Sequence, residues 1–323
     1  IQTTYAIEET AKAIKVLKPD CLLLLGDRFE TIAASLAATL SCLPVVHVGG
    51  GYETEGSFDN SFRHAITKMS SLHFVSTHKN AARVIQMGEN PQNVHLVGSA
   101  GLDNFRRNDL ASRDELEDLF GIKFNYPLIM VTLHPTTIGN IDSKTECQSL
   151  LSAMDQLEAT YVITLPNNDP GSQIIRQMQI DFARSHVNTV AISALGERKY
   201  LGLFQLVDAI VGNSSSAIIE APFIKKPVVN IGDRQKGREK STNIIDVPPT
   251  SESIYKGLKT ALSKSFQIKA KNCKSYHGDG YTSSRIASIL KKWSPPDVPR
   301  KIFYKIQGVN NHILTENCLK ERQ

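Results

Sequence analysis

The stretch Cys21-Leu-Leu-Leu-Leu-Gly26 decides the fold class. A short, continuous apolar run that ends at a glycine is typical of a strand buried on both faces of a parallel sheet. Residues 4–17 before it and 28–40 after it carry apolar side chains near helical spacing. The same alternation continues, and we expect further strands at 44–48, 73–76, 95–98, 128–133, 161–165, 189–193, 209–212 and 227–231. This order predicts an α/β architecture with parallel sheets.

We expect two Rossmann-like domains. Between residues 104 and 126 no strand is expected and the sequence is rich in charged residues. This favours a domain boundary there. The expected units are an N-terminal domain at 1–113, a C-terminal nucleotide-binding domain at 114–253, a helical segment at 254–293 and a tail at 294–323. A doubly wound domain ordinarily opens on its phosphate-facing strand, whereas this chain opens on a helix. We therefore expect the first domain to lack its initial strands.

Composition and charge exclude several classes of protein. Of the 323 residues, 41% are hydrophobic and 21% are charged, which is the balance of a folded globular protein. No apolar run approaches the roughly 20 residues of a membrane-spanning helix. The first ten residues lack a signal-peptide pattern, so we expect a cytoplasmic protein. The net charge of +5 is too small to predict nucleic-acid binding. The five cysteines contain no CxxC pair, which excludes a zinc cluster.

Polar side chains follow the expected strands, at the edge of a parallel sheet where ligands bind. Residues 26–30 (GDRFE) place an acid and a base directly after the first strand. Residues 47–64 form a glycine-rich loop with Glu53, Glu55, Asp59, Arg63 and His64 beside it, groups that serve acid–base chemistry or hold anions. LHPTT at 133–137 and PNNDPGS at 166–172 follow two further strands. Taken singly, these segments also fit helix caps, a mobile loop and plain turns.

Residues 212–222 (GNSSSAIIEAP) are the most informative of these segments. Small hydroxyl residues between a strand and a helix expose N–H groups at the positive end of the helix, which suits phosphate. Glu220 lies about one and a half turns into that helix, where a carboxylate can accept both hydroxyls of a ribose. Residues 230–238 (NIGDRQKGR) add guanidinium groups suited to pyrophosphate. Neither GxGxxG nor GxxxxGK[ST] occurs, so neither a dinucleotide redox site nor a P-loop is predicted.

In this order the motifs resemble the hydrolysing UDP-N-acetylglucosamine 2-epimerase family, whose fold is similar to that of the GT-B glycosyltransferases. The matching segments are GDRFE (26–30), DNSFRHAITK (59–68), LHFV (72–75), VGSAGLDN (97–104), LHPTT (133–137), PNNDPGS (166–172), GNSSSAIIEAP (212–222), NIGDRQKGR (230–238) and YHGDG (276–280). Arg28 after the Gly-Asp pair favours the hydrolysing branch, because the non-hydrolysing relatives carry Thr there. The resemblance implies a homodimer that takes a UDP-sugar substrate. We expect no cofactor and no metal.

The resemblance also implies a reaction and a set of site residues. A base removes the proton from C2 while UDP leaves C1 on the opposite face, and water then adds to the resulting glycal. The residues expected to hold the nucleotide are Arg28, His134, Asn167, Ser214, Ser215, Glu220 and Arg234, with Glu220 on the ribose. The residues expected to serve the sugar and the chemistry are Asp27, Glu53, Asp59, Arg63 and His134.

The chain departs from the family pattern in its second loop. Gly49 and Tyr52 stand at both places where a carboxylate is expected, and Asn60 replaces the second acid of an Asp-Asp pair. The alternatives are that Glu53 or Glu55 takes over, that the sugar differs, for example a 2,4-diacetamido-6-deoxy sugar, or that catalysis is lost. A truncated or degenerate UDP-sugar-binding relative and a GT-B glycosyltransferase are the other candidate functions. Arg28 disfavours the transferase.

Overall fold

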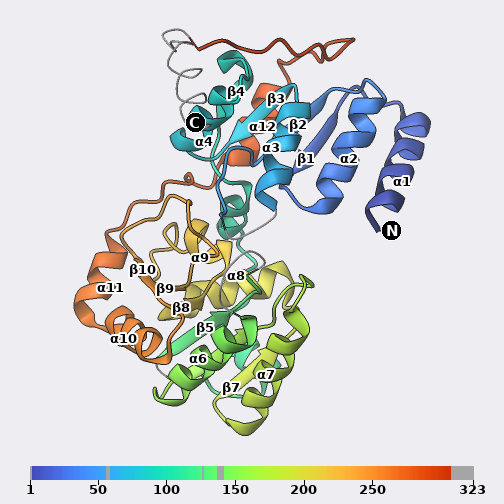
Figure 1. Cartoon of the computed structure of the whole chain (residues 1–323). Helices are drawn as coiled ribbons and strands as arrows, with labels where there is room; N and C mark the ends of the chain where they lie inside the picture. Colours follow the sequence, from blue (N-terminus) through green and yellow to red (C-terminus); the bar gives the residue numbers. More distant parts are fainter. Residues whose placement is uncertain (1, 56–58, 126, 137–141, 307–323) are drawn as a thin grey trace, which may run out of the picture.

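The structure, a computed structural model, describes residues 2–55, 59–125, 127–136 and 142–306. Figure 1 shows two α/β halves, each built on its own sheet. The first sheet has the order β1-β2-β3-β4, with strands β1 (Leu22–Leu25), β2 (Val45–Val48), β3 (Leu72–Val75) and β4 (Val94–Leu96). Its neighbouring strands pair in parallel. The predicted α/β class with parallel sheets is therefore confirmed.

The second sheet has six parallel strands in the order β10-β9-β8-β5-β6-β7. They are β5 (Leu128–Thr132), β6 (Thr160–Thr164), β7 (Thr189–Ile192), β8 (Ala209–Gly212), β9 (Val228–Ile231) and β10 (Ile244–Val247). This is the Rossmann strand order, and its direction reverses between β5 and β8, where ligands bind beyond the carboxyl ends of the strands. Strand β10 was missed from the sequence, because this four-residue edge strand is only partly buried.

The first sheet is covered on its two faces by helices from distant parts of the chain. Its half contains helices α1 (Gln2–Leu17), α2 (Phe29–Leu40), α3 (Asp59–Met69) and α4 (His78–Gln86). On one face Ala38 of α2 and Ile66 of α3 pack against Leu24 and Val45. On the other face Ile286 of α12 (Thr282–Leu290) packs against residues of β2 and β3.

Strand β1 corrects one prediction. We expected residues 21–25 to be buried on both faces, yet Leu23 is 52% exposed and Leu25 is 67% exposed. Leu24, which points to the opposite face, is buried against α2. Strand β1 pairs only with β2 and forms the edge of the described sheet. Helix α12 packs on the face that carries Leu23 and Leu25, over β2 and β3, but these two residues do not belong to its apolar cluster, so the apolar run is half-buried.

The helices of the second half form two layers around its sheet. Helices α5 (Arg113–Phe120), α8 (Gly196–Leu206) and α9 (Ser215–Ile219) contribute apolar residues to one face. Helices α6 (Ser143–Asp155), α7 (Ser172–Ser185) and α10 (Ser251–Leu262) cover the other, and α11 (Lys264–Lys271) follows α10. Within the described residues, no helix combines the length and the apolar character needed to cross a membrane.

The chain passes between the halves twice, and the two crossings are bonded together. The first crossing runs through the 3-10 helix η2 (Ala100–Arg106), and the second precedes α12. The N–H of Ser99 donates to the carbonyl of His277 at 2.6 Å, and the N–H of Thr282 donates to Asp103 at 2.9 Å. These bonds fix the two crossings against each other.

The C-terminal part of the chain is therefore shared between the halves. Helices α10 and α11 lie with the second sheet, whereas α12 lies with the first, so the expected helical segment 254–293 is divided (Figure 1). Lys301 extends the return to the first half, where its Nζ lies 2.6 Å from Glu89. The exact domain boundaries remain a prediction, and residues 307–323 of the expected tail lie outside the described residues.

Candidate active site

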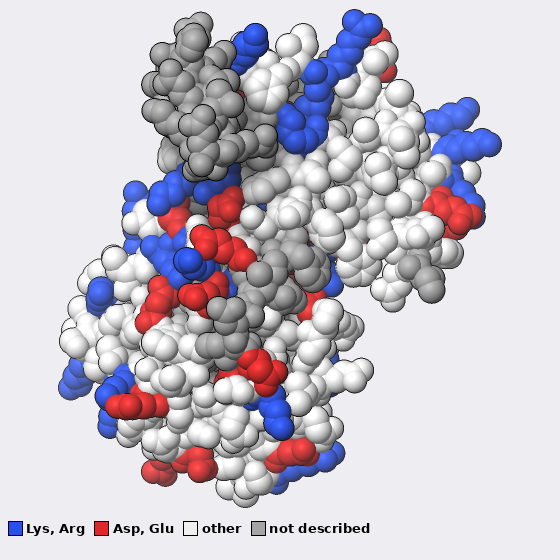
Figure 2. Space-filling view, in the orientation of Figure 1, with Lys and Arg blue, Asp and Glu red and all other residues white. Residues whose placement is uncertain are grey.

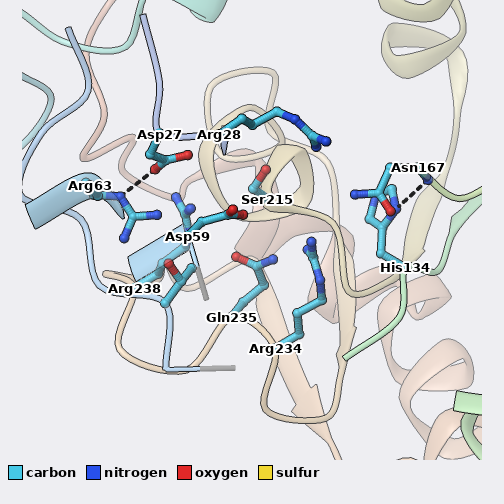
Figure 3. Close-up of a pocket in the computed structure, with 11 residues that line it drawn as sticks. Asp27, Arg28, Asp59, Arg63, His134, Asn167, Ser215, Arg234, Gln235 and Arg238 are labelled. Carbon is cyan, nitrogen blue, oxygen red and sulfur yellow. Dashed lines mark hydrogen bonds and ion pairs between the residues drawn. The ribbon is translucent and has the colours of Figure 1, made fainter. Parts of the chain in front are cut away.

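A cavity of about 250 Å³ lies between the two halves (Figure 3). Figure 2 shows that positively and negatively charged side chains gather at the junction of the two halves. The residues that line the cavity are Asp27, Arg28, Thr54, Asp59, Arg63, His134, Asn167, Ser215, Arg234, Gln235 and Arg238. The structure thus brings together most of the predicted site residues. Of those predicted, Glu53, Ser214 and Glu220 do not line this cavity.

The cavity occupies the carboxyl ends of the strands. Asp27 and Arg28 follow β1, His134 follows β5, and Ser215 follows β8. Strands β5 and β8 are the neighbours at which the second sheet reverses its order, so the site lies where the Rossmann topology opens a crevice. Gly212 makes this closeness possible, because a Cβ there would lie 1.8 Å from the carbonyl oxygen of Thr132.

His134 is held in one tautomer. Its Nδ1 lies 3.2 Å from the backbone N–H of Asn167, which can only donate, so Nδ1 accepts and the proton resides on Nε2. The side chain of Asn213 fixes the backbone of His134 from both sides, at 2.7 and 2.8 Å. Burial lowers the pKa of His134 to about 4, with Arg234 acting in the same direction. At neutral pH His134 is therefore an uncharged hydrogen-bond donor.

One end of the cavity combines carboxylates with a buried arginine. Arg63, 1% exposed, donates from Nε to Asp27 at 2.5 Å and from Nη1 to the carbonyl of Tyr52 at 3.0 Å. Nη1 also donates to Asn60 at 2.8 Å. Asn60 therefore has a structural role, because its oxygen also accepts the N–H of Thr54 at 3.0 Å. Asp27 thus forms an ion pair with Arg63. Asp59 also lines the cavity, so two carboxylates lie on its wall.

Glu53 does not line the cavity with these carboxylates, and its predicted catalytic role stays a prediction. Its carboxylate is bound by His64 at 2.9 Å, by Arg83 at 3.2 Å and by Asn60 at 3.2 Å. Glu55 is likewise occupied, since it pairs with Lys236 of the second half at 2.9 Å. Glu53 and Glu55 were the candidates to take over from the carboxylates expected at Gly49 and Tyr52, and both are engaged by neighbouring side chains instead. Neither replaces the missing carboxylates in this conformation.

The other end of the cavity is lined by Arg234, which backbone oxygens hold in place. Arg234 donates to the carbonyls of Pro135 at 3.3 Å and Asn213 at 3.2 Å. Gln235, which the sequence analysis did not assign, donates to the same Asn213 carbonyl at 2.8 Å. Ser214 instead caps α9, where its hydroxyl accepts the N–H of Ser216 at 3.4 Å. Ser215, which was also predicted to hold the nucleotide, lines the cavity, whereas Ser214 does not.

Two glutamates, Glu220 and Glu146, lie near this end of the cavity without lining it. Burial raises the pKa of Glu220 to about 7, and its Oε2 has no hydrogen-bond partner among the described residues. A Cβ on Gly101 would lie 3.3 Å from Glu220 Oε1, so this carboxyl faces the first crossing. Burial also raises the pKa of Glu146 to about 7, and its carboxylate accepts a bond from Thr136 at 3.2 Å. Glu146 lies within a helix, where no sequence motif marked it.

Comparisons with known proteins agree with this geometry. A hydrolysing UDP-N,N'-diacetylbacillosamine 2-epimerase of Legionella pneumophila is 38% identical over 84% of this chain and 71% of its own length. A hydrolysing GDP/UDP-N,N'-diacetylbacillosamine 2-epimerase of Campylobacter jejuni is 36% identical over 75% of this chain and 63% of its own length. The match thus spans about two thirds of these relatives.

The fold agrees as well. The crystal structure of UDP-GlcNAc 2-epimerase from Neisseria meningitidis bound to UDP-GlcNAc superimposes with a TM-score of 0.78, at 22% identity, over 90% of this chain and 81% of that one. The sequence model of the UDP-N-acetylglucosamine 2-epimerase family matches residues 1–291. Sequence, fold and the position of the cavity therefore lead to one conclusion: the chain belongs to the UDP-N-acetylglucosamine 2-epimerase family.

Proposed function

We propose that this chain is a hydrolysing nucleotide-sugar 2-epimerase, which converts a UDP-linked 2-acetamido sugar and water into UDP and the free 2-epimer. The observation that carries the proposal is the composition of the cavity. One end holds arginines and a neutral histidine donor, which suit a diphosphate, and the other holds two carboxylates, which suit proton transfer at a sugar carbon. The names of the hydrolysing relatives support the same reaction.

The nucleotide is bound first by the groups of the second half. Arg234 and Arg28 offer guanidinium donors to the diphosphate, and the Ser215 hydroxyl adds a neutral donor. The buried Glu220 accepts the ribose hydroxyls, which supply the donors that its Oε2 lacks. Binding in this orientation directs C1 and C2 of the sugar toward Asp27 and Asp59.

Elimination and hydration then follow at these two carboxylates. One of Asp27 and Asp59 takes the C2 proton, the electrons of the C–H bond form the C1–C2 double bond, and the C1–O bond breaks as UDP leaves. His134 Nε2–H and Arg234 stabilise the charge that develops on the leaving diphosphate. Water then adds its oxygen to C1, and a proton is delivered to C2 on the face opposite to the one from which the first proton was removed. No group other than water is consumed.

The finer assignments follow the relatives. We propose a 2,4-diacetamido sugar as the natural substrate, because hydrolysing 2-epimerases of diacetylbacillosamine are 36% and 38% identical to this chain. A polysialic acid biosynthesis protein of Escherichia coli, 35% identical, supports a place in the synthesis of sialic-acid-type sugars. We further propose that the protein acts in the cytoplasm as a homodimer.

Product analysis in heavy water tests the proposed reaction. The protein is incubated with UDP-GlcNAc and with the UDP-linked 2,4-diacetamido sugar, and UDP release and deuterium at C2 of the free sugar are measured. We expect both, with faster release from the diacetamido sugar. An Arg234→Ala variant, which loses a diphosphate donor, serves as the inactive control. UDP release without deuterium at C2 would show simple hydrolysis and refute epimerisation.

One observation favours a second function. The loop that carries Gly49 and Tyr52 lacks its expected carboxylates, and Glu53 does not replace them. A protein with this loop could bind the UDP-sugar without turning it over. Calorimetry with UDP, run beside the product assay, separates the two functions: binding without release of UDP from either sugar favours the binding protein.

A further inference from the structure

Arg238 is a cationic side chain of the cavity wall to which the reaction above assigns no task, although it lies in the motif at 230–238 whose guanidinium groups suit pyrophosphate. Its guanidinium lines the cavity, and within the described residues its Nε and Nη1 are buried without a hydrogen-bond partner. Burial and the neighbouring Arg63 lower the pKa of Arg238 to about 10, so it is still charged at neutral pH. Buried charged donors without acceptors are costly. The third guanidinium nitrogen, Nη2, is not among these buried atoms, and it is the donor that a ligand oxygen in the cavity would meet.

Tyr52 holds this guanidinium in position. The Arg238 guanidinium lies over the Tyr52 ring, 4.7 Å from its centroid, in a cation–π contact. The hydroxyl of Tyr52 bonds to Nδ1 of His277 at 3.2 Å, which fixes the ring against the second crossing. The carbonyl of Tyr52 accepts a bond from Arg63 at 3.0 Å. One residue thus supports an arginine from each half of the protein.

The position of Arg238 places it at the sugar end of the cavity. Figure 3 shows it on the side of Arg63 and Asp59, away from His134 and Asn167. The carboxylates of this end accept hydrogen bonds from sugar hydroxyls. A guanidinium has only donors, so it complements a group that only accepts. On an N-acylated sugar, the group of that kind is the acyl carbonyl oxygen.

We propose that Arg238 is a specificity-determining residue that donates to the carbonyl oxygen of an N-acyl substituent on the sugar, and that Tyr52 is its positioning residue. The inference rests on the proposed function and deepens it, because it names the group that the sugar must carry. Sites built around buried hydrogen-bonding groups discriminate strongly against analogues that leave those groups unpaired. A sugar with a hydroxyl in place of the acylamino group would leave Arg238 without its carbonyl acceptor.

Calorimetry with three ligands tests the proposal. UDP, UDP-glucose and UDP-GlcNAc are titrated into the Asp59→Asn protein, in which the ligand is not consumed, with and without Arg238→Ala. We expect UDP-GlcNAc to bind at least about tenfold more tightly than UDP-glucose when Arg238 is present, the size of a charge-assisted hydrogen bond. Arg238→Ala should abolish this ratio and leave the affinity for UDP unchanged. Arg184→Ala, at an exposed arginine, is the matched control and should leave all three affinities unchanged.

Variants of Tyr52 test the positioning role. Tyr52→Phe keeps the ring under the guanidinium and should retain the ratio between UDP-GlcNAc and UDP-glucose, whereas Tyr52→Leu should reduce it. If Arg238→Ala fails to fold, as judged by circular dichroism, Arg238→Lys keeps the charge but not the planar donors and should reduce the ratio as well.

Two results would overturn the proposal. An equal loss of affinity for UDP and for UDP-GlcNAc would assign Arg238 to the diphosphate. An unchanged ratio in the Arg238 variants would show that it does not read the substituent. Failure of the Asp59→Asn protein to bind UDP at all would instead count against the proposed function, so the two failures are distinguishable.

Discussion

Amide variants of the three candidate acids separate the base from its neighbours. Asp27 and Asp59 line the cavity, whereas the carboxylate of Glu53 is occupied by His64 at 2.9 Å and Arg83 at 3.2 Å. An amide keeps the shape of the carboxylate but cannot take up the proton. We therefore expect Asp27→Asn and Asp59→Asn each to lower the rate of UDP release by roughly 10²- to 10⁴-fold, the usual contribution of a general acid or base.

Glu53→Gln should behave differently. The amide loses the charge that His64 and Arg83 face, which costs about 1–3 kcal/mol of unfolding free energy when a partly buried charged bond is lost. The melting temperature should fall by a few degrees, while the rate at 25 °C stays close to that of the unsubstituted protein. Glu53→Gln thus lowers stability with little effect on activity, whereas Asp27→Asn, which also loses the charge paired with the buried Arg63, should lower both.

The assay follows UDP release and deuterium at C2 in single turnovers in heavy water. Calorimetry with UDP verifies that each variant still binds the nucleotide, so that a slow rate reports on chemistry. Loss of deuterium incorporation in Glu53→Gln, with unchanged affinity for UDP, would refute our assignment of the base. Full activity in both Asp27→Asn and Asp59→Asn would refute it equally.

Three further predictions address the histidines and the sheet. In nitrogen-15 NMR, His134 should show a bare Nδ1 and a protonated Nε2 from pH 5.5 to pH 8, and a protonated Nδ1 would contradict the tautomer. The folded pKa of His277 is about 4, below its unfolded value of about 6.5, because of burial. As the pH falls from 6.5 to 4 only the unfolded chain takes up this proton, so roughly 3 kcal/mol of stability is lost. In His277→Gln, the free energy of unfolding measured with urea should depend less steeply on pH between 6.5 and 4. An unchanged pH dependence would contradict this prediction. Gly212→Ala should destabilise by more than about 4 kcal/mol, since its Cβ would lie 1.8 Å from the Thr132 oxygen, whereas Gly196→Ala meets no atom within 4 Å. Equal unfolding midpoints for these two variants would refute the steric argument.

Much of the fold was predictable because the signals are local. A buried parallel strand requires a short apolar run, and a helix that crosses over it requires apolar residues at helical spacing. Residues 128–133 and 209–212 met the first requirement and proved to be neighbours in the second sheet. Strand β10 (Ile244–Val247) carries a weaker signal because an edge strand buries less of its surface. Which strands lie side by side was not readable, since pairing joins segments that are distant in the chain.

The site was predicted in part for the same reason. Motifs at strand ends marked Asp27, His134 and Arg234, because their position after a strand already places them at the ligand-binding edge. The motif at 230–238 also contained Arg238, but nothing in the sequence separates an arginine that lines a cavity from one that faces solvent. Glu53 was predicted as a substitute for the carboxylates expected at Gly49 and Tyr52, and its contacts with three neighbouring side chains could not be foreseen.

The sequence by itself determined the α/β class, the parallel sheets, the chemical groups available to the site and the family to which they belong. Only the tertiary structure decided how these groups are used. It made His134 a neutral donor, paired Glu53 with His64 and Arg83, and placed the Arg238 guanidinium over the ring of Tyr52. Charge, burial and hydrogen bonding depend on residues that approach from distant segments, and these approaches exist only after the two halves have folded around the cavity.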